Sequence, residues 1–466
     1  MGMRVAILAM LVVGTLWAAA AAGPATGPGQ GLRVTPVVEA YRKAGPAVVN
    51  ISTERLVASG RRLFGDGDDP FEEFMERLFG RTVPAISLGS GFLIHPEGYI
   101  ITNTHVVQRA QKITATLADK STYEAVVVAA NSTDDLAVLK IKDPAGRRFA
   151  FLRLGQSDDL MIGETAIAIG NPLGYQNTCT TGVISALNRK LEFRGGVVYD
   201  GLIQTDAPIN PGSSGGPLLN IAGELIGINT AIRADAQGIG FATPVGRLAA
   251  DIPKLLDFER MNRVVFGLSV RQLHAEAGEE LLVEAVAAGT PAAEAGCKAG
   301  DRLLALDGKA LSQLPEFQVA MLKVAAGANV RLGLLRGGKR VDVVVRLKPR
   351  PKPDGGALSE GLLGLQLRTV TPDLAGQLQL PVEAGLLVTE VVPGGPADRL
   401  GIRRRDIVIQ LGRFYVADLD EIGAVLEDVR PGDSLRIDII RGRTRAWATI
   451  TARQPPAAPA KEKLRI

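Results

Sequence analysis

The C-terminal half of the chain carries the same segment twice, and this duplication limits the folds open to it. GTPAAEAGCKAGDRLLALDG at 289–308 matches GGPADRLGIRRRDIVIQLGR at 394–413 with a constant offset of 105 residues. Two copies predict a pair of tandem domains, because a solenoid needs three or more stacked repeats. The length of 466 residues accommodates about three domains in all, so one further domain is expected before the pair.

Composition and the N-terminus indicate a folded, exported protein. Hydrophobic residues make up 46% and charged residues 22% of the chain, which is typical of folded proteins. A basic start at Arg4, the apolar stretch Val5–Trp17 and the small residues Ala18–Ala22 have the order of a secretory signal peptide. The apolar stretch is short for a membrane span. We therefore expect a mature protein outside the cytoplasm, with an uncleaved N-terminal membrane anchor as the alternative.

Charge and potential metal ligands argue against two classes of function. The 53 Lys and Arg and the 49 Asp and Glu are scattered, which predicts no nucleic-acid-binding stripe. His95, His105 and His274 are isolated from one another and from both cysteines, so no metal site is predicted. Cys179 and Cys297 are predicted to be two buried thiols in preference to a disulfide.

Short apolar or alternating runs follow one another from Ile86, separated by turn residues, and predict an antiparallel barrel or sandwich. A helical stretch near 245–258 is expected to close this region. The predicted divisions are a signal peptide at 1–22, a flexible linker at 23–34, a β-rich domain at 35–258, repeated domains at 262–349 and 359–453 with a linker at 350–358 between them, and a disordered tail at 454–466.

The segment PGSSGGP at 211–217 is a candidate nucleophile turn. Glycines on both sides of a serine allow a tight turn whose N–H groups point one way, which can expose a nucleophile and form an oxyanion hole. Gly215 and Gly216 also leave room for a substrate backbone. A turn of this composition is by itself more often an ordinary loop, so its chemistry depends on a nearby base.

His105, in ITNTHVV at the end of a strand-like run, is the best candidate base. His95 lies in the turn HPEG and His274 in the duplicated half, which makes both poorer candidates. A carboxylate must orient the imidazole, and STDDLAVLKI offers Asp134 and Asp135. Alternation along a strand would point these two to opposite faces, so only one can meet the histidine, and the residues alone do not decide which.

TNTHVV, DLAVLKI and QTDAPINPGSSGGPLLN, in this order and spacing, resemble the HtrA/DegP-like extracytoplasmic serine proteases. The resemblance runs from about Val37 to Arg453. It implies a mainly β fold: a chymotrypsin/trypsin-like double β-barrel, the protease domain at 35–258, followed by two PDZ domains, which are small β-barrels with helices. It also implies a serine endopeptidase that needs no cofactor.

The resemblance assigns roles residue by residue. It implies His105 as the base, Asp135 as the residue that orients it, and Ser214 as the nucleophile, with the oxyanion hole formed by the backbone N–H groups of Gly212 and Ser214. The family commonly has Asn where this chain has Ser213, and we expect activity to survive because the backbone N–H remains. IGFATPV resembles the strand along which substrate pairs, and its candidate contacts and pocket walls are Gly240, Phe241 and Ala242.

VFGLSV at 265–270 and LLGLQL at 362–367 resemble the PDZ loop that holds the carboxylate of a peptide C-terminus. The ordinary alternative is that each glycine only turns the chain. The expected contacts of peptides with apolar C-termini are Phe266, Gly267, Leu268, Leu363, Gly364 and Leu365.

Three functions are compatible with these sequence features. The favoured one is a periplasmic endopeptidase of misfolded or damaged proteins, in which the PDZ domains capture substrate or activate the enzyme and chaperone activity can coexist. The family further implies a homotrimer or larger homo-oligomer, and a regulatory loop around 58–82. The alternatives are a chaperone that no longer cleaves, and an exported PDZ scaffold with an unrelated β domain. The three ordered motifs favour the first.

Overall fold

The computed structural model describes most of the chain between residues 33 and 453. The described ranges are 33–54, 86–108, 110, 112–131, 134–171, 178–192, 198–232, 238–275, 278–412, 414–442 and 444–453. The predicted signal peptide, nearly all of the 23–34 linker, the 58–82 loop and the tail therefore lie outside the described residues. None of the helices among the described residues has the length and apolar character that a membrane-spanning segment requires.

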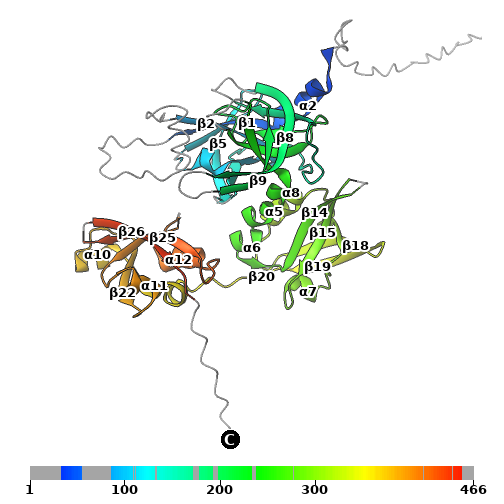
Figure 1. Cartoon of the computed structure of the whole chain (residues 1–466). Coiled ribbons are helices and arrows are strands. Elements are labelled where there is room, and N and C mark those ends of the chain that lie inside the picture. Colours follow the sequence, from blue (N-terminus) through cyan, green and yellow to red (C-terminus); the bar gives the residue numbers. More distant parts are fainter. Residues whose placement is uncertain are drawn as a thin grey trace, which may run out of the picture.

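The first closed barrel is built from six antiparallel strands (Figure 1). It follows α2 (Pro36–Ala44), which Thr35 caps, and the 3-10 turn η1 (Gly45–Ala47). Its strands, in the order in which they neighbour one another, are β1 (Val48–Glu54), β2 (Ile86–His95), β3 (Tyr99–Thr102), β6 (Leu136–Ile141), β5 (Thr122–Asn131) and β4 (Lys112–Thr116).

The sequence LAVLKI of β6 shows why the first barrel packs against a second one. Five of its six residues are buried, so the strand is apolar on both faces. Ala137 and Leu139 enter the core of the first barrel, while Leu136 and Val138 enter a cluster that also contains Ile167 of the second barrel. Alternation along one strand thus fills a barrel interior and an interface between barrels at once.

The second closed barrel also has six antiparallel strands, with a core of small and medium side chains such as Ala166, Ala168, Ile184 and Leu218. Its strand order is β10 (Pro217–Leu219), β11 (Leu225–Ile232), β12 (Gly240–Pro244), β9 (Val198–Thr205), β8 (Thr178–Glu192) and β7 (Thr165–Gly170). The helical stretch expected near 245–258 ends earlier as α5 (Val245–Leu255), and a separate short helix, α6 (Phe258–Met261), follows it.

The two repeated segments form sheets of the same topology. The strand order of the first sheet is β14 (Leu268–Ala275), β15 (Gly278–Val286), β16 (Arg302–Leu306), β18 (Asn329–Arg336) and β19 (Lys339–Arg346), and β17 (Lys309–Ala310) also pairs with β16. This copy further contains a separate pair of strands, β13 (Val264–Val265) and β20 (Lys348–Pro349), and the helices α7 (Pro291–Glu294) and α8 (Leu314–Met321). The strand order of the second sheet is β21 (Leu365–Thr369), β22 (Leu386–Val391), β23 (Ile407–Leu411), β25 (Ser434–Arg441) and β26 (Thr444–Thr451), and β24 (Phe414–Tyr415) also pairs with β23. The helices of this copy are α9 (Gly355–Leu358), η3 (Ser359–Leu363), α10 (Pro372–Leu378), α11 (Pro396–Arg399) and α12 (Leu419–Leu426).

A buried aspartate is paired with an arginine at the same place in both copies. Arg336 donates from Nε and Nη2 to the two Asp301 oxygens at 2.7 and 2.6 Å. Arg441 does the same to Asp406 at 2.8 and 2.7 Å, 105 positions further on. Each arginine also donates to the carbonyl of the glycine that ends the preceding helical turn. These bidentate pairs fix the turn before the central strand of each sheet.

Replacing Asp301 by asparagine should therefore destabilise the first repeated domain in a pH-dependent way. The Arg336 guanidinium lowers the pKa of the Asp301 carboxyl, so the pair stabilises the fold above the pKa of an unfolded aspartate and loses that effect as pH falls through the lower folded value. We expect Asp301→Asn to lower the melting temperature of this domain by roughly 5 °C at neutral pH and by less in strong acid.

Calorimetry of the full chain measures this difference. Asp342→Asn is the matched control, because that carboxylate is 57% exposed and lies 3.5 Å from Arg340. An Asp301→Asn effect of the same size at neutral and strongly acidic pH would contradict the ion-pair explanation.

The two cysteines are free thiols in separate domains. Cys297 is buried, and Cys179, in β8, is half-buried, so only one of the two matches the predicted buried thiol. Burial raises the pKa of both thiols. Among the described residues, no group of three or more His, Cys, Asp or Glu side chains is arranged to hold a metal ion.

Candidate active site

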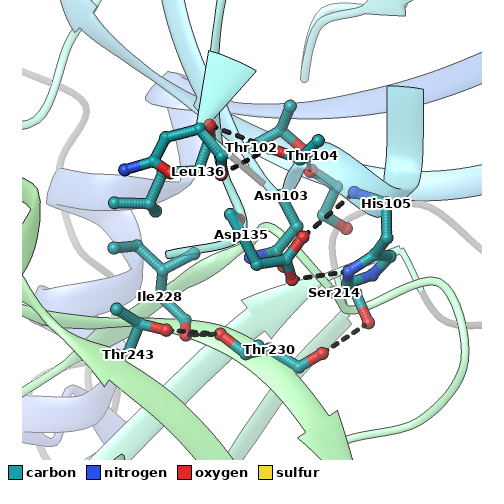
Figure 2. A network of polar contacts seen from close by, with 12 residues as sticks. Thr102, Asn103, Thr104, His105, Asp135, Leu136, Ser214, Ile228, Thr230 and Thr243 are labelled. Carbon is teal, nitrogen blue, oxygen red and sulfur yellow. Dashed lines mark hydrogen bonds and ion pairs between the residues drawn. The ribbon is translucent and has the colours of Figure 1, made fainter. Parts of the chain in front are cut away.

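Side chains from both barrels converge at the candidate site (Figure 2). His105 and Asp135 belong to the first barrel, and Ser214 belongs to the turn that leads into β10 of the second. The structure thus brings together the three residues that the sequence placed 30 and 79 positions apart. Each of the three residues lies in the segment that follows a strand (β3, β5 and β9), so its position depends on how the chain turns after that strand.

His105 lies in α4 (Thr104–Val107), a short helix that begins two residues after the end of β3. The strand β3 ends at Thr102, and the next two residues turn inward toward one acceptor. Asn103 Nδ2 and the Thr104 backbone N–H donate to the Asp135 carbonyl at 2.9 and 3.2 Å. These side-chain and turn bonds replace the strand ladder and point His105 toward Asp135.

Asp135 holds the histidine through both carboxylate oxygens. Its Oδ2 lies 2.6 Å from His105 Nδ1, and its Oδ1 accepts the His105 backbone N–H at 3.0 Å. Asp135 is only 2% exposed and has a φ of 54°, a left-handed conformation that aspartate tolerates better than most residues. A carboxylate that binds Nδ1–H leaves Nε2 as the basic nitrogen.

Asp134 points elsewhere. Its Oδ2 accepts from Asn131 Nδ2 at 2.7 Å, and its Oδ1 lies 3.6 Å from Arg247. Burial and the neighbouring Asp251 carboxylate raise the pKa of Asp134. The left-handed backbone at Asp135, rather than strand alternation, separates the two side chains, because both residues precede β6.

The Ser214 turn is held between the two barrels. The Ser90 N–H donates to the Ser214 carbonyl at 2.8 Å, and the Gly215 N–H donates to the Asn229 carbonyl at 2.7 Å. Gly215 has a φ of 84°, and a Cβ there would lie 2.2 Å from the Ser90 carbonyl oxygen. Only glycine fits this position. The half-buried Ser214 hydroxyl lies 3.4 Å from the Thr230 carbonyl oxygen.

The peptide between Gly212 and Ser213 is fixed at both ends. Ser90 Oγ donates to the Gly212 carbonyl at 2.6 Å, and the Ser213 N–H donates to the Asn210 carbonyl at 2.8 Å. The N–H groups of Gly212 and Ser214, on either side of this peptide, have no acceptor among the described residues. Two uncommitted donors beside a serine hydroxyl are what stabilisation of an oxyanion requires.

Three parts of the chain match known family models. Residues 89–228 match a trypsin-like peptidase domain, and residues 264–347 and 387–441 each match a PDZ domain. The Chlamydia pneumoniae protein named "Probable periplasmic serine endoprotease DegP-like" is 37% identical over 416 residues, covering 83% of each chain. The Escherichia coli "Periplasmic pH-dependent serine endoprotease DegQ" is 35% identical over 420 residues, covering 85% of this chain and 87% of that protein.

The chain belongs to the HtrA/DegP family of serine endoproteases. A solved serine endoprotease from Yersinia pestis is 30% identical and covers 68% of this chain and 99% of its own, with a TM-score of 0.38. The predicted fold class, the double β-barrel with two PDZ domains, and the predicted enzyme class are both confirmed.

The predicted substrate strand of this HtrA-family chain needs a correction. Gly240, Phe241 and Ala242 lie in β12, which is paired with β11 on one side and with β9 on the other at these same residues. No edge of β12 is therefore free to pair with a substrate backbone. Their role as pocket walls stays a prediction.

The neighbouring strand β11 has the free edge that β12 lacks. Its pairing with β10 ends at Ile228, and Asn229 bonds to the turn at Gly215 and Gly216. Beyond Asn229, no strand among the described residues pairs with β11 on that side, which faces the Ser214 turn. The segment GINTAI carried the sequence signal for this free edge. It is an apolar strand that directly follows the Ser214 turn and its hairpin, and such a strand lies next to that turn.

Several polar residues that support this site were not predicted from the sequence. Thr102 Oγ1 donates to the Ser90 carbonyl at 2.7 Å, and Thr104 Oγ1 donates to the Leu136 carbonyl at 2.9 Å. Thr230 and Thr243 share a 2.9 Å hydroxyl contact beneath Ser214 (Figure 2). The run of polar residues in TNTH, between two apolar stretches, was the available signal for the first two.

The two candidate carboxylate loops occupy equivalent places. Phe266, Gly267 and Leu268 run from the end of β13 into the start of β14, and Leu363, Gly364 and Leu365 run from the end of η3 into the start of β21. Both glycines have left-handed backbones, with φ of 81° and 73°. The side chains of the flanking residues are buried, so each loop presents its backbone rather than its side chains.

Proposed function

We propose that this chain is a periplasmic serine endopeptidase that cleaves misfolded or damaged proteins through a Ser214–His105–Asp135 triad. The observation that carries the proposal is the pair of 2.6 and 3.0 Å contacts that bind His105 to Asp135, next to Ser214, whose own N–H is uncommitted, as is that of Gly212. The names of the relatives, both periplasmic serine endoproteases, support the compartment and the class of reaction.

The reaction follows from the roles of these groups. His105 Nε2 takes the hydroxyl proton as Ser214 Oγ attacks the scissile carbonyl, and Asp135 stabilises the imidazolium that forms. The N–H groups of Gly212 and Ser214 bind the negative charge that develops on the carbonyl oxygen. His105 then protonates the leaving amine, and water hydrolyses the acyl-enzyme.

The extended substrate is proposed to lie along the free edge of β11. A segment that pairs there reaches the Ser214 turn directly, because Thr230 of this strand is the residue whose carbonyl faces Ser214. Gly240, Phe241 and Ala242 of the adjacent β12 would then line the pocket for the residue at the cleavage site. The buried Phe241 and Ala242 favour a small apolar side chain there.

The PDZ loops are proposed to bind peptides with apolar C-termini and to raise the activity of the protease. Phe266–Leu268 and Leu363–Leu365 each place backbone N–H groups at the start of an edge strand, β14 and β21, which a peptide can extend. The N-terminal residue pattern adds the proposal of a signal peptide, and the family resemblance adds that of a homotrimer or larger assembly.

Casein degradation by the mature protein tests this function. The rate is measured with and without a peptide that ends in an apolar residue with a free carboxylate, and with the same peptide amidated. We expect cleavage that the free carboxylate enhances and the amide does not. Absence of cleavage under every condition by a folded protein would instead favour a chaperone that does not cleave.

A further inference from the structure

The carboxylate loop of the first PDZ domain already holds a carboxylate of its own chain. Glu259 Oε1 accepts the Phe266 N–H at 3.1 Å and the Gly267 N–H at 2.6 Å. Glu259 belongs to α6, the short helix between the protease domain and the loop (Figure 1). These two N–H groups are the donors that the proposed function assigns to a peptide C-terminus. The N–H groups that a peptide C-terminus would bind are therefore already bonded to Glu259.

The residue before Glu259 adds an apolar group to this contact. The Phe258 ring is 5% exposed and lies edge-on to Phe266, with 5.8 Å between ring centres, and edge-on to Phe317 of α8 at 6.1 Å. An apolar side chain next to a carboxylate is the pair of features that an apolar peptide C-terminus presents. Phe258 and Glu259 thus supply both from inside the chain.

The loop and α6 are each fixed by other contacts, so the occupancy does not depend on a single bond. The Ala292 N–H donates to the Phe266 carbonyl at 3.0 Å and the Ala287 N–H donates to the Gly267 carbonyl at 2.9 Å, which hold the loop in place. Asp257 Oδ1 caps α6 by accepting the Arg260 N–H at 3.1 Å, and the Arg260 side chain pairs with Asp428 of the second PDZ domain at 2.6 Å. The Glu259 carboxylate is therefore presented at high effective concentration.

The second copy lacks this occupant. Its helix α9 is capped by Asp354 as α6 is by Asp257, at an offset of 97 residues that also relates Gly364 to Gly267. At the same offset, Gly355 and Gly356 stand where the first copy has Phe258 and Glu259. The Gly364 N–H donates to the backbone carbonyl of Glu360 at 3.1 Å. Among the described residues, a side-chain carboxylate bonds to the loop N–H groups only in the first copy.

We propose that Phe258 and Glu259 form an intramolecular ligand of the first PDZ groove, and that a peptide C-terminus binds there by displacing the Glu259 carboxylate. This inference rests on the proposed peptide-binding role of the loop. In this arrangement Glu259 lowers the apparent affinity of the first PDZ groove for peptides. Only peptides whose C-terminus binds strongly then displace the Glu259 carboxylate.

Peptide affinity measured on the full chain tests the inference. Fluorescence anisotropy follows a labelled peptide with an apolar C-terminal carboxylate on a Ser214→Ala background, which prevents cleavage. We expect Glu259→Ala to bind about tenfold more tightly than the parent, and Glu259→Gln, which keeps an uncharged acceptor, to lie between them. Asp342→Asn, on the opposite edge strand of the same sheet, is the matched control and should not change the affinity.

Selective ¹⁵N labelling of phenylalanine provides a second readout that does not require a peptide. The Phe266 amide resonance should move between the parent and Glu259→Gln, because the charge of its acceptor is removed. It should move again when the peptide is added to the parent. The Gln variant carries the test if the Ala variant does not fold.

The possible results distinguish the intramolecular ligand from the proposed peptide-binding role of the loop. If the parent prefers the carboxylate peptide to its amide, and the Glu259 variants bind no more tightly, the intramolecular ligand is contradicted and the peptide-binding role stands. If no protein distinguishes the carboxylate from the amide, the peptide-binding role is contradicted and the inference falls with it. An unmoved Phe266 resonance in Glu259→Gln would also overturn the inference.

Discussion

Replacing Ser214 by alanine is expected to lower the rate of casein cleavage by about 10⁵-fold or more, because the acyl-enzyme route needs its hydroxyl. The substitution removes one oxygen from a turn whose geometry is set by backbone bonds at Ser90, Gly215 and Asn229. We therefore expect the variant to fold as the parent does, with an unchanged melting temperature.

Ser213→Ala is the matched control for this variant. It deletes the same atom from the adjacent residue, whose N–H donates to Asn210 and so lies outside the pair of uncommitted donors. We expect it to keep most of the parent activity. Equal losses in both variants, or substantial cleavage by Ser214→Ala, would contradict the assignment of Ser214 as nucleophile.

Replacing Asp135 by asparagine should lower kcat by about 10⁴-fold, the size of effect that the same change has in chymotrypsin-type triads. The Asn amide would donate to His105 Nδ1, where the carboxylate now lies at 2.6 Å. The imidazole proton would then sit on Nε2, and the ring could not accept the Ser214 proton. Steady-state kinetics with a peptide substrate measure the loss as a fall in kcat with a smaller change in KM.

Asp134→Asn provides the comparison for that variant. Its carboxylate bonds to Asn131 and faces Arg247, and the pKa of this group is raised by burial and by Asp251, so the amide is a mild replacement. We expect kcat to remain close to that of the parent. A loss in Asp134→Asn as large as that in Asp135→Asn would mean that the fold of this segment, rather than the tautomer of His105, explains the result.

Much of the architecture could be predicted from the sequence because it depends on short-range patterns. Apolar runs such as LAVLKI form strands with two buried faces, and the identical residues at an offset of 105 fold into sheets of the same topology. His105 and Ser214 also followed as candidates from the motifs TNTH and GSSGG, and the family resemblance singled out Asp135.

What the sequence did not predict depends on contacts between distant segments. The residue pattern alone left Asp134 and Asp135 open, because the arrangement of Asp135 depends on its left-handed backbone and on two donors in the turn after β3, neither of which a strand pattern contains. The free edge of the second barrel lies on β11 because β9 covers β12. No motif in the sequence marks Glu259, and only the folded loop places its carboxylate on two backbone N–H groups.

Labelling with a fluorophosphonate, followed by mass spectrometry of the modified peptide, tests the central claim most directly. Such probes react with serines that a neighbouring base activates and an oxyanion hole assists. The Asp135–His105–Ser214 arrangement predicts one phosphonyl group, on Ser214, in the parent protein, and a greatly slowed reaction in Asp135→Asn. A folded protein that takes up no label, or that carries it on Ser213 or another serine, would contradict the account.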